Sequence, residues 1–197
     1  MGDSMTGAIM TCPQRQHLWP GLLEAWPGWS LCVDGGWGVP ENFCRSLELA
    51  REVAAGEWAL MIQDDIVPRQ GLPAELAEWL SDVPADAAMA AGFSLGWTRD
   101  PRDVARGVKW RRRKRGELLW IMILAVRTGA VAEVVAGVRS QGGLVSADDR
   151  LRRWLDTTTV QSYTHLPSVV QHVGERSVMS HGWTIGGRPR QSPTFRQ

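Results

Sequence analysis

Apolar and amphipathic stretches alternate along the first half of the chain. Uniformly apolar runs that stop at turn-forming residues predict three buried strands, at residues 7–10, 29–33 and 58–62. Amphipathic stretches between and after these runs predict helices, at residues 14–25, 41–55 and 73–80. This alternation is typical of an α/β fold in which crossover helices connect the strands of a parallel sheet.

The second half of the chain is less regular. Its apolar pattern predicts strands at 87–95 and 118–126, helices at 129–138 and 146–156, and a loop or short strand at 164–173. Residues 99–115 predict a charged loop, and the Pro-, Gly- and Arg-rich residues 186–197 predict a disordered basic tail. The length of 197 residues, without internal repeats, predicts a single domain over residues 1–185.

Composition is that of an ordinary globular protein, with 44 % hydrophobic and 22 % charged residues. The three cysteines form no C-x-x-C pair, which argues against a disulfide framework or zinc knuckle and favours a reducing cytoplasm. The longest apolar run, residues 118–126, is too short to cross a bilayer, so we expect no membrane partner. The 11 tryptophans suit either core filling or stacking on a ligand.

Polar residues follow each of the first three predicted strands, as Thr11-Cys12-Pro13, Asp34 and Asp64-Asp65. The carboxyl ends of parallel strands meet at one edge of a sheet, where α/β proteins bind ligands, so we expect these residues to converge. Adjacent carboxylates at such an edge suit a hard divalent cation, Mg²⁺ or Mn²⁺, that also binds phosphates. A solvated Asx turn leading to Pro68 is the alternative interpretation of the Asp pair.

A second acidic pair, Asp148-Asp149, follows Ser146 at the start of a predicted helix. The spacing of Ser146 and Asp149 favours a capping box, in which each residue binds the backbone of the other. The alternative is that Asp149 serves as a general base at the helix start. The sequence pattern leaves both interpretations open.

Charge is distributed unevenly along a chain whose formal net charge is +1. Residues 99–115 hold nine basic and two acidic residues, a balance of +7, which leaves −6 for the rest of the chain. Such a segment, with tryptophans nearby, is able to bind a phosphate backbone and stack on a base. A solvated charged loop is the alternative.

Four stretches together resemble the small GT-A glycosyltransferases, including the compact bacteriophage-type enzymes. Residues 8–15 (AIMTCPQR) are similar to the first strand and its nucleotide-contacting loop, and residues 61–66 (MIQDDI) to the strand that ends in the DxD motif. Residues 147–149 (ADD) resemble the acidic motif that supplies the base. Residues 166–174 (LPSVVQHVG) resemble the C-terminal segment whose histidine completes the metal site. Gln63 and Asp148 depart from the family's usual Asp and Glu.

The resemblance implies a GT-A-like, Rossmann-like fold, a mostly parallel sheet with flanking helices. Residues 7–95 would form the nucleotide-sugar half and 96–185 the acceptor half. It implies that a sugar moves from a nucleotide-sugar, with a UDP-sugar favoured, to an acceptor hydroxyl with the help of Mn²⁺ or Mg²⁺. The base would invert the anomeric configuration. A phage-encoded enzyme of this kind would act in the host cytoplasm.

The resemblance also implies roles for individual residues. The metal ligands would be Asp65 and His172, with Asp64 contacting the metal or the donor ribose. Asp149, in the acidic motif with Asp148, would be the catalytic base. Asp34 would meet the nucleobase or the ribose, and the remaining donor contacts would be Thr11, Cys12, Pro13 and Arg15.

The acceptor that the basic segment favours is DNA carrying hydroxymethylated pyrimidines, while a protein or glycan acceptor stays open. The acceptor contacts would then be Trp97, Trp110, Arg111, Arg112 and Arg113. A sugar-phosphate nucleotidylyltransferase is disfavoured, since residues 11–15 lack the Gly-rich G-x-G-x-R loop of that family. The alternative from another class is a non-catalytic nucleic-acid-binding protein built around residues 99–115.

Overall fold

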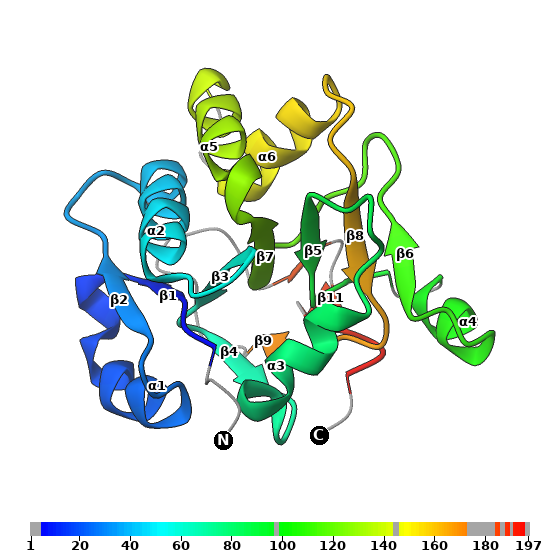
Figure 1. The fold of residues 1–197 in the computed structure, drawn as a ribbon, viewed down its shortest axis with the longest axis horizontal. Coiled ribbons are helices and arrows are strands. Elements are labelled where there is room, and N and C mark those ends of the chain that lie inside the picture. The colour runs from blue at the N-terminus through cyan, green and yellow to red at the C-terminus, as the bar shows by residue number, and fades with distance from the viewer. Residues whose placement is uncertain are drawn as a thin grey trace.

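The computed structural model describes residues 5–96, 99–143, 146–172, 184–185, 188–189 and 191–195 (Figure 1). Seven strands form one sheet in the order β2-β1-β3-β7-β5-β8-β6. Their bounds are β1 (Ala8–Thr11), β2 (Ser30–Val33), β3 (Trp58–Gln63), β5 (Met89–Ala91), β6 (Trp110–Arg112), β7 (Ile123–Arg127) and β8 (Ser162–His165). The helices are α1 (Trp19–Ala25), α2 (Val39–Val53), α3 (Leu72–Ser81), α4 (Asp100–Ala105), α5 (Val131–Ser140) and α6 (Ala147–Leu155).

Most strands of the large sheet run in one direction. β1 is parallel to both β2 and β3, and β5 is parallel to β8. β7 lies antiparallel between β3 and β5, and β6 is antiparallel to β8 at the edge. The structure therefore confirms an α/β fold with a mostly parallel, mixed sheet flanked by helices, as in Rossmann-like proteins.

Helices cover both faces of this sheet, which gives two apolar cores (Figure 1). Phe43 and Leu47 of α2 lie in one core with residues of α5 and α6, and Leu22 of α1 lies in the other with residues of α3. β3 is apolar from Trp58 to Ile62 because Met61 faces the first core while Leu60 faces the second. No helix in the described ranges is long and apolar enough to cross a membrane.

A separate two-stranded ribbon lies beside the main sheet. β4 (Ile66–Pro68) pairs antiparallel with β9 (Val170–His172), with Ile66 opposite His172. Residues 191–195, within the stretch for which we expected disorder, pack against this ribbon. Ser192 and Thr194 are buried there, and the Ser192 hydroxyl lies 2.7 Å from that of Ser168. A further short pair, β10 (Thr184–Ile185) and β11 (Arg188–Pro189), is antiparallel.

The expectation of a charged loop over residues 99–115 is wrong. This basic segment contains helix α4 and strand β6, and β6 extends the main sheet by pairing with β8. Asp100 is fully buried and forms an ion pair with Arg111. Arg111 is thus neutralised by Asp100 within the segment and Arg113 by Asp156 outside it, which a count of net charge does not reveal.

Candidate functional site

The residues that follow β1 and β3 meet at the carboxyl edge of the sheet. The Thr11 hydroxyl donates a hydrogen bond to Asp64 Oδ2 at 2.6 Å. Arg15 Nη1 lies 2.6 Å from Asp64 Oδ1 and 2.9 Å from Asp65 Oδ2. A 3₁₀ helix that begins at Pro13 turns the chain back, so that Arg15 is only 6 % exposed. The convergence expected from the parallel strands is present for these four side chains.

His172 joins the same cluster from the far end of the sequence. It lies opposite Ile66 in the β4–β9 ribbon, and its Nε2 is 3.1 Å from Asp65 Oδ2. We call Thr11, Arg15, Asp64, Asp65 and His172 the acidic edge.

The backbone of His172 is held by a side chain from the adjacent position. Gln171 Oε1 accepts hydrogen bonds from the amide of His172 at 3.1 Å and from the amide of Ser192 at 2.8 Å. Residues 191–195 therefore support the strand that carries His172. Neither Gln171 nor Ser192 has a sequence signal that marks this role, since the contact is made by tertiary packing alone.

The two carboxylates of the acidic edge have different electrostatic surroundings. Burial raises the pKa of Asp64, and the hydrogen bond from Thr11 and the charge of Arg15 only partly oppose this effect. Burial also acts to raise the pKa of Asp65, but contacts with His172 and Arg15 outweigh it and lower that pKa. Asp65 is therefore the carboxylate more strongly held in its charged form.

Asp65 Oδ1 is buried and has no hydrogen-bond partner among the described residues. A buried charged oxygen without a partner is costly, and such atoms in native structures call for an explanation. A bound cation would supply the missing interaction. This atom is the most direct sign in the described part of the chain that the acidic edge takes a ligand.

The donor set of the acidic edge fits a divalent cation that shares its coordination with a substrate. No group of three or more His, Cys, Asp or Glu side chains within the described ranges is arranged to enclose a metal. Mg²⁺, however, is usually held by one or two carboxylates together with waters and substrate phosphates. Asp65 Oδ2 and His172 Nε2, at 3.1 Å, have the separation of neighbouring ligands with bonds of about 2.1 Å.

Three further residues expected at the donor edge are placed as follows. The backbone amide of Asp34 donates to the carbonyl of Thr11 at 2.9 Å, so Asp34 lies beside the acidic edge. Its Oδ1 accepts hydrogen bonds from the amides of Gly36 and Trp37 and thereby forms the turn after β2. Burial and the nearby Asp64 raise the pKa of Cys12, which keeps this thiol protonated. Pro13 begins the turn that positions Arg15.

The side chain of Asp148 holds the start of α6 close to the acidic edge through a hydrogen bond to the backbone. Its Oδ1 accepts a hydrogen bond from the amide of Ile121 at 3.1 Å. The carbonyl of the next residue, Met122, accepts from the amide of Gln63 at 2.9 Å. Because Gln63 leads directly into Asp64, the first turn of α6 and the acidic edge are linked through two hydrogen bonds.

The side chain of Asp149 is not used by the helix cap. Ser146 Oγ accepts from the backbone amide of Asp149 at 3.5 Å, so the serine caps α6 through the main chain. The Asp149 carboxylate lies 3.6 Å from Arg152 Nε and is 46 % exposed. The reciprocal half of the capping box, from Asp149 to the amide of Ser146, is not found in the described part of the chain.

The expected acceptor contacts are largely engaged inside the fold. Arg111 pairs with buried Asp100, and Arg113 pairs with Asp156. Trp110 packs against the ring of His165, with 4.8 Å between the ring centroids. Arg112 is exposed and donates to Gln161, while Trp97 lies outside the described residues. The charge run alone does not distinguish an arginine that faces solvent from one that neutralises a buried carboxylate.

Comparison with protein-family models and with curated protein sequences gives no match to this chain. Function is therefore inferred from the residues of the acidic edge and their geometry. The fold alone is compatible with many activities, because Rossmann-like sheets carry unrelated chemistries.

Proposed function

We propose that this chain is a metal-dependent glycosyltransferase with a GT-A-like fold, which moves a sugar from a nucleotide-sugar to an acceptor hydroxyl. The observation that carries the proposal is the unpartnered, buried Oδ1 of Asp65, a residue whose other oxygen, Oδ2, lies 3.1 Å from His172 Nε2 at the carboxyl edge of parallel strands. A UDP-sugar is the donor that we favour. The resemblance of residues 8–15, 61–66, 147–149 and 166–174 to this class supports the same activity.

Asp65 and His172 would hold Mn²⁺ or Mg²⁺, with Asp64 beside them. When bound, the cation would offset negative charge on the diphosphate of the donor. The low pKa of Asp65 keeps this ligand ionised at neutral pH without a change in protonation. Thr11 fixes the orientation of Asp64 through its 2.6 Å hydrogen bond.

Arg15 would supply a fixed positive charge beside the proposed cation site, where the leaving diphosphate would also bind. It is buried and already bonded to both carboxylates, so its orientation is set before the substrate arrives. Asp34, next to Thr11 at the end of β2, would contact the ribose or base. Cys12 and Pro13 would contribute backbone contacts in the loop between Thr11 and Arg15.

Asp149 is proposed as the base that takes the proton of the acceptor hydroxyl. Its carboxylate is half-exposed and free of the cap, and Arg152 Nε lies 3.6 Å away. Asp148 acts as a positioning residue, because it anchors the start of α6 to Ile121. A base on the acceptor side implies a single displacement with inversion at the anomeric carbon, which NMR of the product would show directly.

A donor screen tests the proposal. Thermal shift of the full chain is measured with UDP-, GDP- and ADP-sugars in Mn²⁺ and in EDTA, followed by donor hydrolysis. We expect one nucleotide class to raise Tm in Mn²⁺ and not in EDTA, and to be hydrolysed slowly. Absence of any metal-dependent shift or hydrolysis across the panel would contradict the proposal. A non-catalytic nucleic-acid-binding protein would retain DNA binding in EDTA and show no turnover.

DNA is less well supported as the acceptor than the charge run alone indicates. Arg111 and Arg113 are held in ion pairs with Asp100 and Asp156. The exposed cations of the basic segment are fewer: Arg102, Arg106, Lys109, Arg112, Lys114 and Arg115. Lys109 forms an ion pair with Asp82. The acceptor is therefore better sought in the shape and chemistry of the remaining surface.

A further inference from the structure

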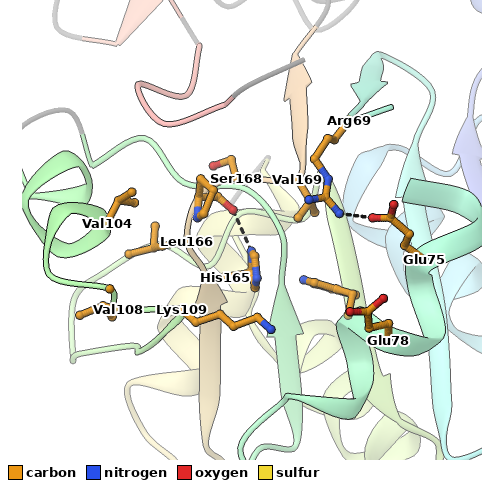
Figure 2. Close-up of a pocket in the computed structure, with 13 residues that line it drawn as sticks. Arg69, Glu75, Glu78, Val104, Val108, Lys109, His165, Leu166, Ser168 and Val169 are labelled. Atoms are coloured by element: carbon orange, nitrogen blue, oxygen red, sulfur yellow. Dashed lines mark hydrogen bonds and ion pairs between the residues drawn. The ribbon is translucent and has the colours of Figure 1, made fainter. Parts of the chain in front are cut away.

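A pocket of about 520 Å³ lies beyond the β4–β9 ribbon, between α3, the residues that follow α4, and the end of β8 (Figure 2). Residues 166–169, which connect β8 to β9, form its floor. Pockets of this volume hold a small organic ligand in many proteins. It is separate from the acidic edge, since it contains none of the five residues of that cluster.

The walls of the pocket differ in chemistry. Val104, Val108 and Leu166 form one side in Figure 2, and Arg69, Glu75 and Glu78 lie on the other. Such a division suits a ligand with one apolar and one polar face.

The charges named around the pocket leave a small negative excess. Arg69 pairs with Glu75, and Lys109 pairs with Asp82. Glu78 contributes one further exposed carboxylate from α3. The polar wall therefore has no excess of positive charge, which disfavours a phosphate or another polyanion as the ligand.

The polar wall of the pocket offers both a donor and an acceptor to a ligand. Trp79 is 5 % exposed, and neither its Nε1 nor the Nε of Arg69 has a hydrogen-bond partner among the described residues. Both nitrogens are enclosed by the protein and face no open space, but the Arg69 side chain is 42 % exposed, so the outer part of its guanidinium is able to donate to a ligand oxygen. The carboxylate of Glu78 only accepts hydrogen bonds and requires a ligand donor.

His165 adds a neutral acceptor to the same pocket. Its Nδ1 lies 2.7 Å from the carbonyl of Pro167, which accepts only, so Nδ1 carries the hydrogen and Nε2 carries a lone pair. Burial lowers the pKa of His165 to about 4, and the ring is therefore uncharged at neutral pH. Donors and acceptors are thus interspersed on the walls.

We infer that this pocket binds a carbohydrate, and that this carbohydrate is the acceptor of the proposed sugar transfer. A pyranose has an apolar C–H face for the valine and leucine wall. Its hydroxyls both donate and accept, which matches the Glu78 carboxylate as an acceptor and the exposed part of the Arg69 guanidinium as a donor. The volume suits one or two sugar units.

The pocket is connected to the acidic edge by the ribbon itself. Arg69 directly follows β4, its amide donates to the carbonyl of Val169 at 2.8 Å, and both residues line the pocket. His172 lies at the other end of β9, three residues from Val169, or about 10 Å along a strand. The acceptor role rests on the proposed function, whereas carbohydrate binding by the pocket does not.

Binding is tested with the full chain on a glycan array that also carries single-stranded and duplex DNA, in EDTA and without donor. The test variants are Glu78→Ala, which removes the exposed acceptor, and Val108→Asp, which places charge on the apolar wall. Glu133→Ala, an exposed glutamate of α5, is the matched control. The unfolding midpoint of each variant shows whether it is folded.

We expect binding to one class of glycan, weakened at least about tenfold by Glu78→Ala and by Val108→Asp and unchanged by Glu133→Ala. Binding to no glycan, binding to DNA alone, or glycan binding that both pocket variants retain would overturn the inference. The donor screen separates the two proposals. Donor turnover without glycan binding contradicts the pocket only, and pocket-dependent glycan binding without donor turnover contradicts the transferase only.

Discussion

The acidic edge and the basic segment of residues 99–115 both contain buried ion pairs, but they differ in how completely the charges are matched. In the basic segment, the fully buried Asp100 has Arg111 as its partner and also accepts from the amide of Gly96. At the acidic edge, the single cation Arg15 serves both Asp64 and Asp65, and Asp65 Oδ1 has no partner among the described residues.

This difference distinguishes carboxylates that stabilise the fold from carboxylates that are able to bind a ligand. A carboxylate whose oxygens are all bonded has no capacity for substrate, and its removal harms stability. A carboxylate with an unused buried oxygen costs stability and is expected to be kept for binding. The net charge of a segment does not make this distinction, since the basic segment has the larger net charge and yet its buried carboxylate, Asp100, is the more completely paired.

The largest expected effect is on activity at the acidic edge. Asp65→Asn should lower Mn²⁺-dependent donor turnover by about 100-fold or more, because it removes the charged oxygens beside His172. Steady-state hydrolysis of the donor measures the effect, and the unfolding midpoint confirms the fold. Asp86→Asn, an exposed aspartate near Tyr163, is the matched control. If Asp65→Asn turned over the donor nearly as fast as the parent protein, the incompletely paired carboxylate of the acidic edge would not be a binding residue.

The next effect is on stability in the basic segment. Arg111→Ala leaves Asp100 buried without its counter-ion, which should lower the free energy of unfolding by about 3–5 kcal/mol. Arg112→Ala, at the exposed neighbouring position, should change it by less than about 0.5 kcal/mol. Urea unfolding of both variants measures the difference. Equal, small effects would mean that the segment is held by its backbone and not by its charges.

A smaller effect on stability is expected at His165. This side chain is buried like those of the two regions, but its Nδ1 bonds to a backbone carbonyl and not to a carboxylate. The pKa of His165 is lowered to about 4, so as pH falls below about 6.5 the unfolded chain binds a proton before the folded chain does. This coupling should cost about 2 kcal/mol of stability between pH 7 and pH 4.5. His165→Asn keeps a donor for Pro167 and should lose this part of the pH dependence. Parallel slopes for parent and variant in urea unfolding would contradict the pKa shift.

The smallest effect is expected at the exposed arginines. Replacing Arg102 and Arg106 together by Ala should change the free energy of unfolding by less than about 0.5 kcal/mol per residue. If duplex DNA binds at all, the slope of log K against log salt should be the same in parent and double variant. A slope smaller by about two in the double variant would instead identify a phosphate-binding surface in the basic segment.

The first half of the fold could be predicted because each strand there is buried on both faces or ends at a turn. β3 is a clear case, since its alternate residues enter the two cores and the whole run is therefore apolar. In the second half, some buried apolar residues do not belong to a strand. Leu119 and Ile121 are buried without belonging to β7, so the apolar run 118–126 predicted a strand that begins at Ile123.

Only the part of the candidate site that follows from the order of strands and helices could be predicted from the sequence. Parallel strands bring Thr11 and Asp64 to one edge, and this follows from the order of the elements. The bonding of Arg15 to both aspartates, and the support that Ser192 gives to β9 through Gln171, depend on tertiary packing. Pairing of Arg111 with Asp100 is likewise invisible in a charge count, because it depends on how a strand folds back on a helix.

The small size of the β4–β9 ribbon offers a way to detect ligand binding at the acidic edge. Two strands of three residues each form a marginal unit on their own, so the amides of Val170 to His172 should exchange with solvent sooner than those of β3. A ligand held by Asp65 and His172 would bridge the two strands and slow that exchange. Hydrogen–deuterium exchange of one short peptide thus reports occupancy of the site without a labelled donor, a chosen acceptor or any turnover.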